Sequence, residues 1–230
     1  MKVAANQSNY LPWKGYFDII NSVDLFIFYD DVQYTHGDWR NRNLLKTKDG
    51  IKWITVPVGN KVNRLICDVN IDNNSWQEAH YQKIYNAYHK AKYFADYRPL
   101  LEDIYLDHQW ANLSVMNQYL IRRIAVEYLG IKTQFSDSRG YDLSGKRETR
   151  IVDLLWKTGA SEYLVGPAAR SYLREELLAS NGIRLRWMDY SGYPEYPQFH
   201  PPFEHKVTIL DLLFHTGPKA SSYIWGCRTK

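Results

Sequence analysis

The chain has 230 residues, is 45% hydrophobic and 23% charged, and carries a formal net charge of +4 at pH 7. These values are ordinary for a globular protein with a substantial core. The charge falls short of that of a dedicated nucleic-acid-binding protein, but it is compatible with an anionic ligand such as a nucleotide diphosphate. The 19 Tyr and 8 Trp residues suit a cleft for sugars, bases or peptides, and equally a tyrosine-rich core.

The sequence contains no targeting or membrane segment that we recognise. Its first apolar run is interrupted by Asn6, and no stretch approaches the roughly 18 apolar residues of a membrane span, so we expect a cytoplasmic protein without membrane insertion. Cys67 and Cys227 match no ligand spacing, which favours a reduced chain, with one disulfide as the alternative. No histidine pair has metal-ligand spacing, and we expect neither a metal site nor a cofactor.

In chain order, the first predicted element is a short buried strand at residues 3–5. A polar loop punctuated by proline and glycine follows, and a helix begins near Tyr16. The continuous apolar run at residues 25–29 predicts a buried strand with Asp30 and Asp31 at its carboxyl end. A strand followed by an irregular polar loop and a helix is a typical ligand-binding arrangement in α/β proteins.

The next predicted elements are a hairpin at residues 42–57 and a strand at residues 67–71. Apolar and tyrosine side chains at helical spacing then predict a helical insert or subdomain at residues 73–130. Its predicted helices cover residues 75–88, 96–106 and 113–129.

After Gly130 strands and helices alternate, and an irregular stretch rich in Pro and Tyr separates the last two elements. Strand–helix–strand units at this spacing favour a mostly parallel sheet. We therefore predict a single α/β domain over residues 1–230, with a mostly parallel sheet, flanking helices and the helical insert in the middle of the chain. The predicted strands cover residues 131–135, 163–165 and 183–187, and the predicted helices cover 147–157, 168–179 and 207–214.

The first candidate site combines the N-terminal loop with the acidic end of the second strand. Because the carboxyl ends of parallel strands meet at one crevice, we expect the loop side chains to lie near Asp30 and Asp31 and to bind substrate. The alternative is a loop whose amides only cap backbone groups. The loop residues assigned to binding are Gln7, Asn9, Tyr10, Trp13 and Lys14.

Two basic segments are candidates for phosphate binding. Arg40 and Arg42 are two residues apart, so they share one face of an extended segment, and forked guanidinium groups suit phosphate or carboxylate. Lys146 and Arg150 are four residues apart at the start of a predicted helix, whose N-terminus also favours anions. The segment lacks the two glycines of a P-loop. For Arg40 and Arg42 the alternative is a solvated charge cluster.

Two further positions are candidates near the end of the chain. Gly166 and Pro167 follow a predicted strand, where backbone amides could approach a ligand, although a tight turn explains them equally well. His205 and Asp211 could form a base and its orienting carboxylate. A lone surface histidine is the alternative, and no serine or cysteine nucleophile motif lies nearby.

Taken together, segments along nearly the whole chain resemble the WbqC-like protein family. One departure is visible: the family usually has Gln-Pro-Asn-Tyr in the N-terminal loop, and Ser8 replaces that proline here, which we expect to loosen the loop. The segments that carry the resemblance are residues 7–17, 28–34, 38–43, 163–169 and 193–198, and the helix that includes Asp211-Leu212-Leu213.

The resemblance implies a bacterial protein of surface-glycan biosynthesis, such as that of the O antigen of lipopolysaccharide. It suggests acyl or aminoacyl transfer to an activated amino sugar, without assigning catalytic residues. Our leading hypothesis is therefore a transferase that acylates the amine of a nucleotide-linked sugar. In this hypothesis phosphates are held by Arg40, Arg42, Lys146 and Arg150, and the base or sugar stacks on Tyr10, Trp13 and Tyr34. The proton of the amine is taken by Asp30, Asp31 or His205. The oxyanion faces Gln7, Asn9 or the amides near Gly166.

Three alternatives remain open. The loop echoes the His-x-Gly-His loop of nucleotidyl-transferring and adenylate-forming enzymes, but Trp13 and Tyr16 occupy the histidine positions. A non-catalytic binding protein of a glycan-biosynthesis complex would need no nucleophile. A charged tRNA could be the aminoacyl donor, although a net charge of +4 is small for that partner. The partners we expect are a nucleotide sugar, an acyl or aminoacyl donor, and, as an option, further copies of the chain in a homo-oligomer.

Overall fold

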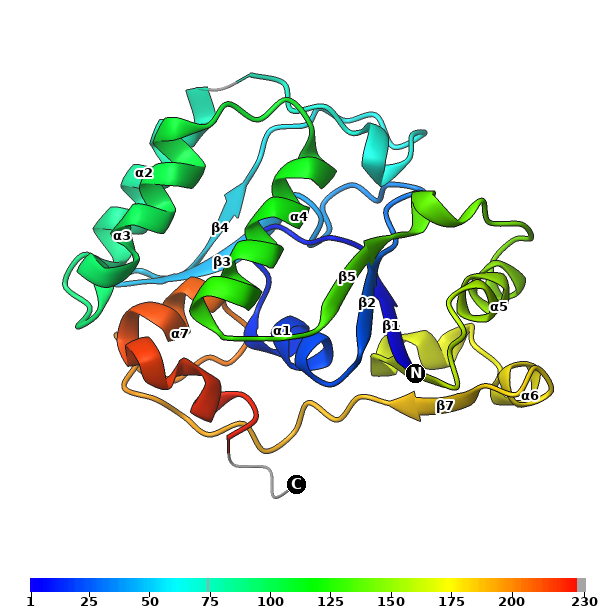
Figure 1. Ribbon diagram of the computed structural model, residues 1–230. Helices are drawn as coiled ribbons and strands as arrows, with labels where there is room; N and C mark the ends of the chain where they lie inside the picture. Colours follow the sequence, from blue (N-terminus) through cyan, green and yellow to red (C-terminus); the bar gives the residue numbers. More distant parts are fainter. Residues whose placement is uncertain (74, 227–230) are drawn as a thin grey trace.

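A five-stranded parallel sheet forms the centre of the computed structural model, which describes residues 1–73 and 75–226 (Figure 1). The strand order is β5-β2-β1-β6-β7, and every neighbouring pair is parallel. The predicted mostly parallel α/β fold is thus confirmed, whereas Cys227 lies outside the described residues. The strands are β1 (Lys2–Asn6), β2 (Leu25–Phe28), β5 (Gln134–Asp137), β6 (Glu162–Val165) and β7 (Arg184–Trp187).

Both faces of this sheet are buried, which explains the continuous apolar runs in its central strands. Side chains alternate along a strand, so Phe26 and Phe28 of β2 pack into one core cluster while Leu25 and Ile27 pack into another on the opposite face. Helices α1 and α4 cover the first face, and α5 and α6 cover the second (Figure 1). The helices are α1 (Lys14–Asn21), α2 (Ser75–Tyr88), α3 (Phe94–Glu102), α4 (Leu113–Arg123), α5 (Glu148–Lys157), α6 (Glu175–Ala179) and α7 (Ile209–Thr216).

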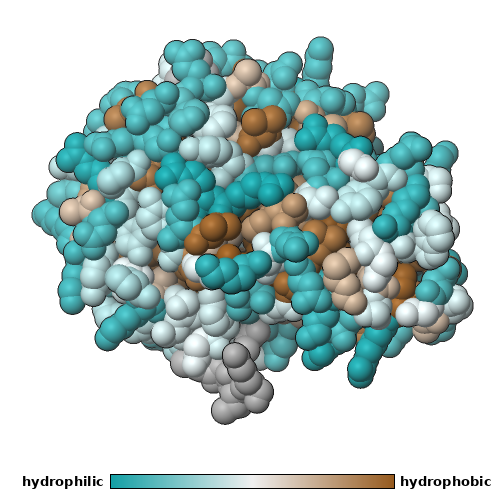
Figure 2. Space-filling model, in the orientation of Figure 1, coloured by the Kyte–Doolittle hydropathy of each residue, from teal (hydrophilic) through white to brown (hydrophobic). Residues whose placement is uncertain are grey.

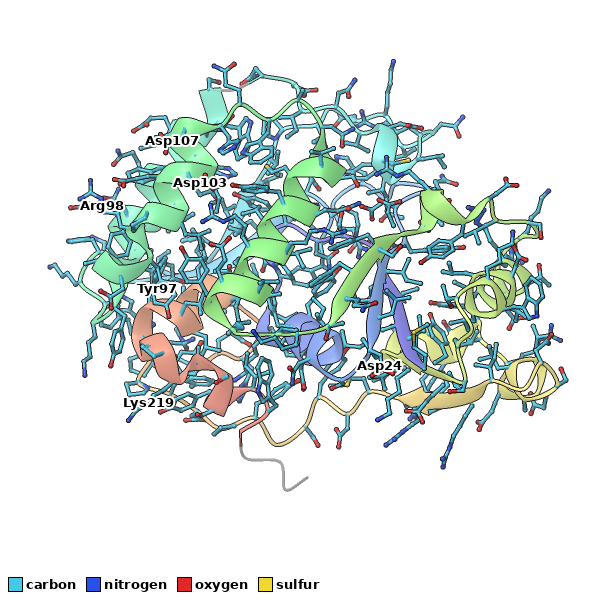
Figure 3. The ribbon with its side chains drawn as sticks, in the orientation of Figure 1. Asp24, Tyr97, Arg98, Asp103, Asp107 and Lys219 are labelled. Carbon is cyan, nitrogen blue, oxygen red and sulfur yellow. The ribbon has the colours of Figure 1, made fainter. Side chains whose placement is uncertain are left out.

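The middle of the chain is helical, as predicted from residues 75–129. Helices α3 and α4 each continue as one π-helical segment, Asp103–Asp107 and Ile124–Tyr128. Asp103 begins the first of these segments and links it to α4 (Figure 3). Its carboxylate accepts hydrogen bonds from Tyr119 and Arg123 of α4. The apolar side chains of these helices belong to the same core cluster as one face of the sheet.

The predicted hairpin is present as β3 (Arg42–Thr47) and β4 (Gly50–Thr55), whereas two other elements differ from the sequence prediction. Residues 67–71 are not a strand, because they meet the 111–113 segment through a single bridge rather than a ladder. The helix predicted at 168–179 is divided into a 3₁₀ segment, Pro167–Ser171, and α6. Buried Leu173 closes the first segment with a hydrogen bond back to Ala169.

In Figure 2 hydrophilic residues cover most of the visible face, and hydrophobic residues gather in a band over the middle of the sheet. Among the described residues, no helix combines the length and apolar character that a membrane crossing requires.

Candidate functional site

The order of the strands defines where a ligand is expected to bind. From β1 the chain runs to β2 and β5 on one side of the sheet, and it later adds β6 and β7 on the other side. In open α/β sheets such a reversal creates a crevice at the carboxyl ends of the two strands that flank it, here β1 and β6. A cleft of about 710 Å³ lies at this point, and we call it the switch-point cleft. Its polar and aromatic lining includes Gln7, Tyr29, Arg147, Arg150, Tyr163 and Tyr172.

Arg150 is the best-fixed cation of the cleft. Its Nε donates a 3.1 Å hydrogen bond to the hydroxyl of Tyr29, and one terminal nitrogen pairs with Asp31. The second oxygen of Asp31 accepts a 2.5 Å hydrogen bond from Ser138. Burial raises the pKa of Tyr29 to about 12 although Arg150 opposes the shift, so the phenol stays neutral. These contacts hold the guanidinium on the cleft wall with its side chain still partly exposed.

Arg147 reaches the same cleft from an unusual backbone conformation. It precedes α5 with φ 51° and ψ −124°, a region that non-glycine residues rarely adopt. Gly145 two residues earlier has φ 81°, and a Cβ there would lie 2.7 Å from Thr149 Oγ1, so the turn requires glycine. Lys146, which the sequence favoured, is exposed and does not line the cleft.

Asp30 is completely buried and serves as an anchor for the N-terminal loop. One of its oxygens accepts the Ser8 N–H at 2.7 Å, and the other accepts the Ser114 hydroxyl and, at 3.3 Å, the Gln118 amide. With these contacts Asp30 positions the loop and is not accessible to a substrate. The loosening expected at Ser8 stays a prediction, but Ser8 supplies to Asp30 an N–H that a proline could not.

Gln7 and Arg40 meet beside this anchor, so segments far apart in sequence do converge. The buried Arg40 guanidinium donates to Gln7 Oε1, and the Arg40 carbonyl accepts from Asn117 Nδ2 at 2.8 Å. Arg42 has a different environment: its guanidinium lies 4.1 Å from the centre of the Trp53 ring. The prediction that the two arginines share one face is wrong, because Arg40 lies in the turn before β3 and not in the strand.

A second, smaller pocket lies on the other side of the N-terminal loop, and we call it the aromatic pocket. It has a volume of about 280 Å³, and Asn9, Trp13, Trp39 and Lys206 are among its lining residues. Asn9 Oδ1 is buried and has no hydrogen-bond partner within the described part of the chain. Asn43 fixes the loop by donating to the carbonyls of residues 10 and 11 at 3.0 and 2.7 Å.

Three predicted binding residues are too deeply buried to touch a ligand in this structure. Tyr10 is fully buried, and its hydroxyl bonds to His80 at 2.9 Å and to Tyr105. Tyr34 is also fully buried. Lys14 is enclosed by aromatic rings and lies 5.0 Å from the centre of Tyr193, and burial lowers its pKa to about 8. Their assignments as stacking or contact residues are therefore corrected to structural roles.

The candidate pair His205 and Asp211 is not formed. The buried Asp211 carboxylate accepts hydrogen bonds from Tyr196 at 2.6 Å and Gln198 at 2.8 Å, and the nearest histidine nitrogen belongs to His215 at 3.7 Å. The spacing of six residues does not bring the two side chains together, because His205 lies in the irregular segment that precedes α7 and not on the helix.

Gly166 and Pro167 form a tight turn rather than a ligand cradle. A Cβ on Gly166 would meet the Tyr190 hydroxyl at 3.4 Å, and Pro167 opens a 3₁₀ segment. Neither residue lines the switch-point cleft. The alternative that the sequence left open, a βα turn, describes them.

The sequence reasoning overlooked several lining residues. Trp39 directly precedes Arg40, which was singled out, and its 39% exposure marks it as available. Tyr163 was assigned only to a buried strand, although the end of that strand forms the cleft. No group of three His, Cys, Asp or Glu side chains among the described residues is arranged to hold a metal ion.

Comparison with known proteins places these features in a family. The WbqC-like protein family matches residues 7–223. The chain belongs to this family. An uncharacterized protein of Mycobacterium tuberculosis, Rv1507c, is 45% identical over 229 residues, which covers 99% of both chains. No solved structure matches the chain.

The extent of the WbqC-like match bears on the site. It begins at Gln7, the first loop residue in the switch-point cleft, and it also includes the whole aromatic pocket. Except for Ala5 and Asn6 of the switch-point cleft, the lining of the two hollows therefore belongs to the part of the chain that matches the family.

Proposed function

We propose that this protein is a transferase that acylates the amino group of a nucleotide-linked sugar in bacterial surface-glycan biosynthesis. The observation that supports it best is the switch-point cleft, with Arg150 fixed on its wall by Tyr29 and Asp31. A guanidinium held in place is well suited to bind a diphosphate, because forked donors match phosphate oxygens. The exposed ring of Tyr172 offers a surface for the base.

The sugar is assigned to the neighbouring aromatic pocket. Its volume of about 280 Å³ suits one sugar ring, and Trp13 and Trp39 supply apolar faces against which such a ring can pack. The buried Asn9 Oδ1 still lacks a hydrogen bond, which a sugar hydroxyl or amine can donate. Gln7 and Asn9 are two residues apart on one loop, so one substrate can extend from the cleft into this pocket.

In the proposed reaction the sugar nitrogen forms a bond to the carbonyl carbon of an activated acyl group. The bond from that carbon to the leaving group of the donor breaks, and the proton lost by the amine passes to the leaving group. A carboxylate next to the cleft, such as Asp31 behind Arg150, can accept this proton on the way. Asp31 is better placed than Asp30, because 14% of its side chain is exposed whereas Asp30 is entirely buried.

Isothermal titration calorimetry with UDP- and dTDP-linked amino sugars tests this proposal. We expect binding by the wild type and a loss of affinity of about tenfold or more in Arg150→Ala, since a charge-assisted phosphate contact is removed. Tyr172→Ala changes an exposed ring and should also weaken binding without affecting folding. Arg98→Ala is the control, because Arg98 pairs with Glu102 on the outer side of α3 (Figure 3).

Two results would contradict the proposal. One is that no nucleotide-linked amino sugar binds. The other is that Arg98→Ala and Arg150→Ala bind equally well. Release of pyrophosphate from a nucleoside triphosphate would instead support the nucleotidyl-transferring alternative.

A further inference from the structure

A third hollow lies away from the carboxyl ends of the strands, between the β3–β4 hairpin and α2. Its volume of about 790 Å³ is similar to that of the switch-point cleft, and the two have no residue in common. We call it the lysine groove, after the Lys48, Lys52, Lys83 and Lys90 side chains that line it.

The lysine groove concentrates the positive charge of the chain. Asp49 is the one carboxylate that lines it, against four lysines, so its lining carries an excess of three positive charges. Within residues 1–73 and 75–226, none of the four ammonium groups has a hydrogen-bond or ion-pair partner. Elsewhere on the surface Arg98, Arg123 and Arg174 each pair with a glutamate, whereas Lys132 and Lys219 are also unpaired within these ranges but are not gathered around a hollow. Unpaired cations around a hollow attract an anionic ligand.

The geometry of α2 directs these charges into the groove. Lys83 and Ala87 are four residues apart and so share one face of α2, and Lys90 follows in the turn just after the helix ends at Tyr88. The small alanine leaves space at the floor, and the two lysines flank it. Lys48 and Lys52 stand opposite, at the tip and on the second strand of the hairpin.

Aromatic rings complete the lining. Trp53 is 46% exposed, and Arg42 lies 4.1 Å from the centre of its ring, which restricts its movement. Phe199 adds a second ring from the segment before α7. Lysines interleaved with aromatic rings form the combination that binds nucleotides, because the rings stack on bases and the cations contact phosphates.

We propose that the lysine groove binds the adenosine phosphate portion of the activated acyl donor. This inference rests on the proposed acyl transfer, which requires a donor site separate from the sugar-nucleotide cleft. Adenosine next to phosphate occurs in two sources of activated acyl groups, coenzyme A thioesters and the aminoacylated 3′ end of an RNA. Both present the same base and phosphate chemistry to Trp53 and the lysines.

The groove is also placed to deliver an acyl group to the acceptor. The ring of Trp53 lies 5.3 Å from that of Trp39, measured between centres. Trp39 in turn lines the aromatic pocket with Asn9, and its carbonyl accepts the backbone N–H of Tyr10 at 3.0 Å. The two tryptophans thus connect the donor groove with the proposed sugar pocket along one continuous stretch of the molecule.

The experiment measures binding of two probes, coenzyme A and a short RNA hairpin with a single-stranded CCA end, by the full chain. Lys52→Glu/Lys83→Glu should weaken binding of the cognate probe about tenfold or more, since two phosphate contacts become repulsive. The matched control is Lys132→Glu/Lys219→Glu, which changes the net charge equally at two exposed positions outside the groove (Lys219 is labelled in Figure 3). It should bind within about threefold of the wild type.

The outcomes separate this inference from the proposed function. Binding of either probe, lost in the groove variant and kept in the control, supports the donor site and identifies its source. Absence of binding to both probes, or equal losses in the two double variants, overturns it. Sugar-nucleotide binding by the groove variant should equal that of the wild type. If the sugar nucleotide fails to bind while a probe binds, the acceptor assignment fails and the adenosine phosphate site stands.

Discussion

At the scale of single residues, Ser8 and Asp30 show how one backbone N–H fixes the loop between the two hollows. The Ser8 N–H lies 2.7 Å from a carboxylate that has no contact with solvent, and hydrogen bonds to such charged groups are among the stronger ones. The Ser8 hydroxyl is buried without a partner in the described structure. The backbone of this residue therefore contributes to stability, and its side chain does not.

This contrast predicts opposite effects for two substitutions at Ser8. Ser8→Pro removes the N–H donor to Asp30 and should lower the free energy of unfolding by roughly 1–2 kcal/mol, after allowing for the smaller entropy of the unfolded chain. Ser8→Ala keeps the N–H and deletes an unpaired hydroxyl, so it should be neutral or slightly stabilising. Urea unfolding of both variants measures the difference. Equal stabilities would show that the hydrogen bond to Asp30 contributes nothing.

At the scale of elements, a buried chain of polar contacts joins α2 to the hairpin and to the N-terminal loop. His80 of α2 bonds to the Thr55 carbonyl through Nε2 at 3.1 Å and to the Tyr10 hydroxyl through Nδ1 at 2.9 Å. The neutral imidazole with its proton on Nε2 satisfies both contacts. Burial, with a smaller contribution from Lys83, lowers the pKa of His80 to about 3.

The His80 contacts predict a loss of stability in acid. Below the ordinary histidine pKa of about 6.5 the unfolded chain binds a proton that the folded chain excludes until about pH 3. Stability should therefore fall as pH falls through this window, by roughly 3 kcal/mol at pH 4. His80→Gln cannot titrate, so the difference in unfolding free energy between wild type and variant should be constant above pH 7 and change in favour of the variant below pH 6. Parallel pH curves would contradict this.

The elements also show what the sequence can and cannot predict. Strands such as Leu25–Phe28 and the hairpin at Arg42–Thr55 were predictable because local periodicity and turn residues determine them. The approach of the N-terminal loop to Asp30 followed from the parallel order, whereas Arg150 reaches the cleft from α5. The sequence could not predict which of these side chains face a ligand, because the burial of Asp30 depends on Ser114 and Gln118 of a distant helix.

At the scale of the whole molecule, the N-terminal strand occupies the centre of the sheet. Strand β1 pairs with β2 on one side and with β6 on the other, and its Val3 and Ala4 are fully buried. The Met1 carbonyl accepts the N–H of Ser161 at 3.0 Å, which ties the start of the strand to β6. The loop that separates the switch-point cleft from the aromatic pocket thus extends from the best-protected strand, while the lysine groove lies beside the exposed strand β4.

This arrangement predicts the pattern of hydrogen exchange. Residues next to a chain terminus usually exchange fast because they fray, but the amides of Val3, Ala4 and Ala5 should be among the slowest, since exposing them requires the whole sheet to open. Amides of β4, whose Ile51 and Trp53 are 43% and 46% exposed, should exchange on the order of 100-fold faster through local opening. Exchange measured by NMR or mass spectrometry decides this. If β1 exchanges as fast as β4, the first strand is not the centre of the cooperative core, and the loop that forms both hollows lacks the rigid support on which the proposed site depends.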